Sequence, residues 1–114
     1  MVSLEIQERR RKLIDNLLFD EDVALQRETF NGCAVGYANT LVYGYCMGPL
    51  EGEDRYHEPY EAFAKAYDLA HSYQAGFVVE ANDRQIWETD RERAIRMGHW
   101  LEKFWKDEGE GQSA

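Results

Sequence analysis

The sequence predicts an α+β fold in which an N-terminal helix precedes two strand-strand-helix units. Apolar residues recur every three or four positions near both ends and in the middle of the chain, as in amphipathic helices. Two intervening segments, one rich in Tyr and Val and the other in Val, Phe and Ile, read as β-hairpins. Within these hairpins, the stretches 34–39 and 77–82 share a Val four places before an Asn, which is a weak internal repeat. We therefore expect an antiparallel sheet of four or five strands with helices packed on one face, and a mainly α fold is the alternative.

The first helix is expected over residues 4–18. Ser3 can cap its start, and Ile6, Leu13 and Leu17 fall on one side. The basic cluster 9–12 is then the solvated face of this helix, and binding of phosphate or of an acidic partner is the alternative reading.

Residues 30–48 admit two interpretations. Small residues recur every four positions, which would form a ridge on a closely packed helix: Gly32, Gly36, Thr40, Gly44 and Gly48. Four glycines in one helix would cost about 1 kcal/mol each relative to Ala, and the Tyr and Val residues favour a strand. We therefore expect a hairpin over residues 33–46.

That hairpin turns at Asn39 and Thr40. Its register places Gly36 opposite Tyr43, so that a ring covers the glycine, and Cys33 opposite Cys46. The dipeptide Asn31-Gly32 favours a hairpin turn, so residues 23–30 are expected to add a third strand.

A loop over 48–57 leads to a second helix over 59–74, with Pro59 in its first turn. A second hairpin follows about Asn82 and Asp83, in which Val79 faces Ile86. The predicted core includes apolar residues from all these elements: Phe63, Tyr67, Val79, Ile86, Leu101 and Phe104.

Thr89 and Glu92 form a capping box for the last helix, which is expected to end near Lys106. The chain is predicted to form one globular domain over residues 1–106 and a disordered acidic tail over residues 107–114.

Composition and charge narrow the classes of function. The chain has 114 residues and a formal charge of −9, and its acidic residues concentrate in 20–30 and 51–61. Such a charge disfavours direct nucleic-acid binding and suits a basic protein partner. No apolar run is long enough to span a membrane and no export signal is evident, so no membrane interaction and a cytoplasmic location are expected.

No catalytic or cofactor-binding motif appears in the sequence. His57 lies among Glu53, Asp54 and Glu58, but the spacing matches no zinc or calcium pattern. His71 is expected at the boundary between core and solvent. We predict no catalytic residue, no metal site and no cofactor, and expect the two cysteines to be free thiols.

The hypothesis that follows is a non-enzymatic, acidic protein-binding module. Seven acidic and tyrosine residues are predicted to bind the partner: Glu51, Glu53, Asp54, Tyr56, Glu58, Tyr60 and Glu61. Such a module could be a small inhibitor, of the type that viruses and mobile elements carry, that occupies the basic surface of a nucleic-acid-binding protein. One alternative is a small enzyme or ligand-binding domain that uses His57 or His71 with nearby carboxylates. A homodimer formed through an edge strand is another.

Overall fold

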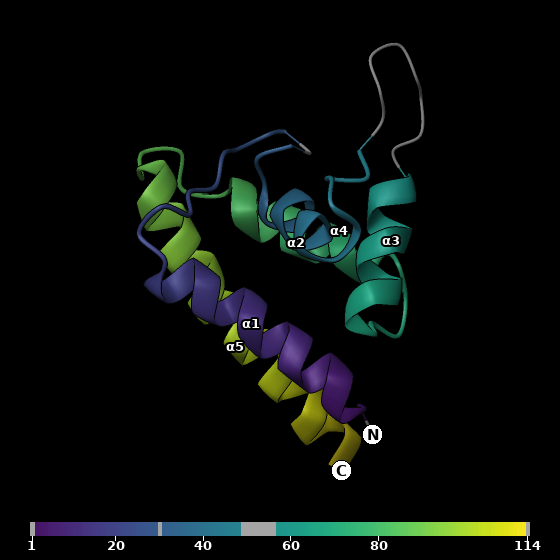
Figure 1. The fold of residues 1–114 in the computed structure, drawn as a ribbon. Coiled ribbons are helices and arrows are strands. Elements are labelled where there is room, and N and C mark those ends of the chain that lie inside the picture. The colour runs from purple at the N-terminus through teal and green to yellow at the C-terminus, as the bar shows by residue number, and fades with distance from the viewer. Residues whose placement is uncertain (1, 30, 49–56, 114) are drawn as a thin grey trace.

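The computed structural model describes residues 2–29, 31–48 and 57–113, and these ranges contain helices and no strand (Figure 1). The helices are α1 (Leu4–Phe19), α2 (Ala34–Tyr43), α3 (His57–Tyr67), α4 (Gln74–Asp83) and α5 (Asp90–Ser113). The predicted α+β fold with an antiparallel sheet is therefore wrong, and the mainly α alternative fits.

Helices α1 and α5 form a long antiparallel pair, with both chain termini at one end (Figure 1). Leu13 and Leu17 of α1 are fully buried. Gly98 of α5 allows this close approach, because a Cβ atom there would lie 2.7 Å from Cδ2 of Leu18. The predicted first helix is confirmed, as is its cap, since the Ser3 hydroxyl accepts a hydrogen bond from the amide of Ile6. Helices α2, α3 and α4 pack on one another beside this pair.

The hairpin predicted over residues 33–46 is helix α2 instead. Gly36 is the one glycine of the small-residue series inside the helix, so the cost of glycine is about 1 kcal/mol rather than four times that. Gly44 ends the helix in the left-handed conformation, with φ of 88°, where glycine carries no Cβ penalty. Burial of Ala34, Val35 and Ala38 against the rest of the core then stabilises the helix relative to the hairpin.

The second predicted hairpin is helix α4. Its buried residues Ala75, Val78 and Ala81 are three apart, which is helical spacing. Asn82 is not a turn residue but a fully buried member of the last helical turn. Its Oδ1 accepts from the amide of Ala34 at 3.0 Å, and its Nδ2 donates to the carbonyl of Gln26 at 2.8 Å. One amide side chain thus joins α4 to the start of α2 and to the preceding connection.

The segment predicted as a third strand, 23–30, belongs to the connection between α1 and α2, where Val23 and Leu25 are buried. Helix α3 ends at Tyr67, earlier than predicted. Helix α5 continues from Asp90 to Ser113, past the expected end at Lys106. The division into a globular domain over 1–106 and a disordered tail over 107–114 stays a prediction, although α5 includes residues 107–113.

The predicted core is correct in part. Phe63, Tyr67 and Leu101 are fully buried, whereas Val79 and Phe104 are half-buried and pack against the core. Ile86 is 65% exposed, because it lies in the turn after α4 rather than on a strand facing Val79.

Candidate protein-interaction surface

The predicted partner-binding residues that the structure describes lie in the first turns of α3. Glu61 is exposed, and Glu58 is half-buried. Tyr60 packs against the core, and burial raises the pKa of its phenol. The other members lie outside the described residues: Glu51, Glu53, Asp54 and Tyr56. The acidic-loop site therefore stays a prediction, with Glu61 as the exposed carboxylate that α3 contributes to it.

The enzyme or ligand-binding alternative relies on His57 or His71, and the structure describes the side chain of His71 only. His71 is exposed, and its ring stacks on Tyr73 with centroids 5.2 Å apart. The side chain of His57 lies outside the described residues. Within the described ranges, no group of three or more His, Cys, Asp or Glu residues could hold a metal ion. Cys33 and Cys46 are free thiols, and Cys33 is buried at the N-terminal end of α2.

The arginines have a common role that the sequence did not indicate. Six of them are buried or half-buried, and each donates hydrogen bonds to backbone carbonyl groups: Arg9, Arg10, Arg27, Arg91, Arg93 and Arg96. Most of these carbonyls lie at helix C-termini, where the last four have no partner within the helix. A cation there also complements the helix dipole.

Two of these contacts hold α1 in place. Arg91 of α5 donates to the carbonyls of Leu17 and Leu18 at the end of α1, both at 2.9 Å. Arg10 of α1 donates to the carbonyl of Tyr67 at the end of α3 at 2.7 Å. Its guanidinium lies 4.8 Å from the ring centroid of Trp105, and burial lowers its pKa.

The end of α4 is held by a buried ion cluster. Arg93, which is 1% exposed, donates to the carbonyls of Asn82 and Arg84, both at 2.7 Å. The carboxylate of Glu88 forms an ion pair with Arg93 at 3.0 Å and accepts a hydrogen bond from Arg96 at 2.6 Å. This cluster therefore fixes the turn between α4 and α5.

Because the arginines face inward, acidic side chains dominate the described exterior. Thirteen acidic residues are exposed: Glu5, Glu8, Asp20, Glu21, Asp22, Glu28, Glu61, Asp68, Glu80, Asp90, Glu92, Glu102 and Asp107. Six basic residues are exposed: Arg11, Lys12, Lys65, Arg84, Lys103 and Lys106. Arg11 and Arg84 are themselves paired with carboxylates. The described surface is thus more one-sided in charge than the formal composition indicates.

The acidic residues gather most where two connections meet. The amide of Leu25 donates to the carbonyl of Asp90 at 3.0 Å, and Arg27 donates to the carbonyl of Asp83 at 2.7 Å. These contacts join residues 19–28 to residues 83–92, and we name the two segments together the loop end. The loop end carries six exposed carboxylates: Asp20, Glu21, Asp22, Glu28, Asp90 and Glu92.

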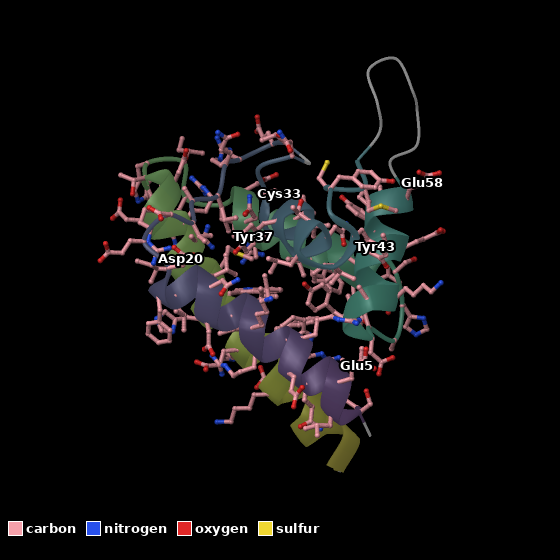
Figure 2. All side chains as sticks on the ribbon, in the orientation of Figure 1. Glu5, Asp20, Cys33, Tyr37, Tyr43 and Glu58 are labelled. Carbon is pink, nitrogen blue, oxygen red and sulfur yellow. The ribbon has the colours of Figure 1, made fainter. Side chains whose placement is uncertain are left out.

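The loop end is distinct from the predicted site. Asp20 and Glu58 lie on opposite sides of the molecule (Figure 2). The acidic stretch 20–30 was visible in the sequence, but its meeting with the turn before α5 depends on contacts between distant residues.

Comparison with known proteins finds no protein-family model that matches this chain, and no curated protein or solved structure similar to it. Among the described residues, no helix is both long enough and apolar enough to cross a membrane.

Proposed function

We propose that this protein is a non-enzymatic, acidic module that binds a basic protein, and that the partner is a nucleic-acid-binding protein whose cationic surface it occupies. The observation that carries the proposal is the inward orientation of the six arginines. Their guanidinium groups donate hydrogen bonds to backbone carbonyls, mostly at helix ends, whereas thirteen carboxylates are exposed to solvent. An acidic exterior attracts a basic surface and repels nucleic acid.

The first experiment asks whether a partner exists and whether charge attracts it. The full chain is immobilised, incubated with lysate at low salt, and washed with increasing NaCl. We expect a basic protein to elute with rising salt, because added ions screen the attraction between exposed charges. The purified partner should then lose its nucleic acid when the full chain is added. Retention of the nucleic acid would contradict occupation of the cationic site.

Two matched triple variants then locate the acidic surface that binds. One neutralises the loop end by Glu21→Gln, Asp22→Asn and Asp90→Asn. The other neutralises the predicted loop site by Glu51→Gln, Glu53→Gln and Asp54→Asn. Both remove three charges, so a general charge effect would slow association equally. A larger reduction in association rate for one triple identifies the surface, and no reduction for either would contradict electrostatic docking.

A second candidate function, small-molecule binding, is favoured by a groove of about 360 Å³ between α1 and α2. Its lining combines charged residues of α1 with apolar residues: Glu5, Glu8, Arg9, Lys12, Leu41, Val42 and Tyr67. This volume lies in the range of ligand sites, and the charges of both signs would suit a zwitterionic ligand. Ligand-observed NMR with zwitterionic fragments tests it, with Leu41→Trp as the variant that fills the groove.

A further inference from the structure

The turn between α4 and α5 presents two apolar side chains to solvent. Ile86 is 65% exposed and Trp87 is 80% exposed, the largest exposed fraction among the large apolar residues that the structure describes. A single exposed apolar residue is ordinary on a protein surface. Here two such residues are adjacent, and neither contributes its apolar area to the core.

Several hydrogen bonds and ion pairs fix the backbone beneath these two residues. The carbonyls of Arg84 and Gln85 accept hydrogen bonds from Arg93, at 2.7 and 3.3 Å. The amide of Glu88 closes the turn on the carbonyl of Gln85 at 3.2 Å, and the Glu88 carboxylate lies between two arginines. Gln85 has a φ of 58°, a left-handed conformation that a residue with a Cβ rarely adopts. Surrounding contacts therefore impose this conformation.

A firmly held turn favours binding through the residues at its tip. Association ordinarily requires a flexible segment to lose conformational freedom, and a pre-ordered segment avoids most of that loss. Trp is also among the residue types that contribute most to binding at protein interfaces, where it fills a pocket on the partner. The turn thus presents exposed apolar side chains on a pre-ordered backbone, which are the two features that favour tight binding.

The charges around the turn indicate the chemistry of the partner. The turn belongs to the loop end, which carries six exposed carboxylates. Asp90 and Glu92 follow the two apolar residues closely in sequence. The hydrogen bond from Leu25 to Asp90 joins the acidic stretch that begins at Asp20 to the same end of the molecule. Arg84, the exposed cation of these segments, is paired with Glu80. A second copy of this chain would bring carboxylates against carboxylates, and an anionic membrane would repel them. A basic surface complements them.

We propose that Ile86 and Trp87 are the anchor of the loop end, and that they insert into an apolar pocket rimmed by Lys and Arg residues on a partner protein. This inference rests on the proposed function and adds the binding surface and the residues that determine affinity. Carboxylates of the loop end guide the encounter, whereas the two apolar side chains slow dissociation.

The test uses the basic protein that salt elutes from the immobilised full chain, purified and titrated with variants by calorimetry and by surface plasmon resonance. Trp87→Ala should raise Kd by about 30-fold, mainly through faster dissociation. Tyr73→Ala is the matched control, because Tyr73 is an aromatic residue 61% exposed in another turn, and its Kd should change less than about twofold. Both variants should unfold at the wild-type urea midpoint, which excludes misfolding as the cause.

Other outcomes separate the inference from the proposed function. If Trp87→Ala and Tyr73→Ala bind equally well while affinity still falls with NaCl, the anchor is overturned and the acidic module stands. If Trp87→Ala weakens binding but NaCl has no effect, the anchor survives and electrostatic docking fails. If light scattering shows a dimer that Trp87→Ala converts to a monomer, the occupant is a second copy and the inference is overturned. Failure to retain any basic protein at low salt overturns both.

Discussion

Replacement of Arg93 by Ala should destabilise the protein by about 3 kcal/mol. Arg93 is 1% exposed, donates hydrogen bonds to the carbonyls of Asn82 and Arg84, and forms an ion pair with Glu88. Removal of one partner from a buried ion pair costs about 3–5 kcal/mol, because the other charge stays buried without compensation. Arg96 also contacts Glu88 and the two carbonyls, so the expected loss lies at the lower end of that range.

Urea unfolding followed by far-ultraviolet circular dichroism measures this loss. The control is Arg84→Ala, which removes an ion pair to Glu80 in which both side chains are more than half exposed. An exposed pair contributes about 0–1 kcal/mol, so this control should unfold near the wild-type midpoint. If Arg93→Ala also loses less than about 1 kcal/mol, the cluster does not hold the turn and the reasoning is refuted.

Three further predictions follow from buried groups. Leu101→Ala should lower the free energy of unfolding by about 2–5 kcal/mol, since Leu101 is fully buried, and a loss under about 0.5 kcal/mol in urea unfolding would contradict this. Asn82→Ala should cost about 2 kcal/mol or more in the same assay, because the Ala34 amide and the Gln26 carbonyl lose their partner. Burial raises the pKa of the Tyr67 phenol in the folded state, so stability should fall as pH rises above about 10, the ordinary value. Absorbance titration should show a tyrosine component that ionises at a higher pH than the exposed tyrosines, and Tyr67→Phe should reduce that component.

The features that the sequence predicted correctly depend on neighbouring residues. The Ser3 cap and the capping box of Thr89 and Glu92 form as expected, since each involves residues three apart. The apolar spacing in α1, α3 and α5 also identified helices there and placed Phe63, Tyr67 and Leu101 in the core.

Tertiary contacts explain why the two segments that were predicted as hairpins are helices α2 and α4. Local preference in α2 and α4 favours strands, because the Val and Tyr residues of α2 and the Val and Phe residues of α4 lose side-chain freedom in a helix. The helices form because their small residues are buried against neighbours, and because Asn82 supplies the amide of Ala34 with an acceptor from 48 positions away. Sequence patterns over a few residues do not contain that contact.

For the proposed interaction surface too, some features follow from the sequence alone and others depend on tertiary contacts. The sequence by itself determined that the chain is strongly acidic and that 20–30 is one acidic stretch. It did not determine that Arg91 and Arg93 would face inward, because a guanidinium finds carbonyl partners only after the helix ends have been brought together. Only the tertiary structure joined the acidic stretch to the turn that exposes Trp87, because hydrogen bonds such as that from Leu25 to Asp90 connect residues far apart in the chain.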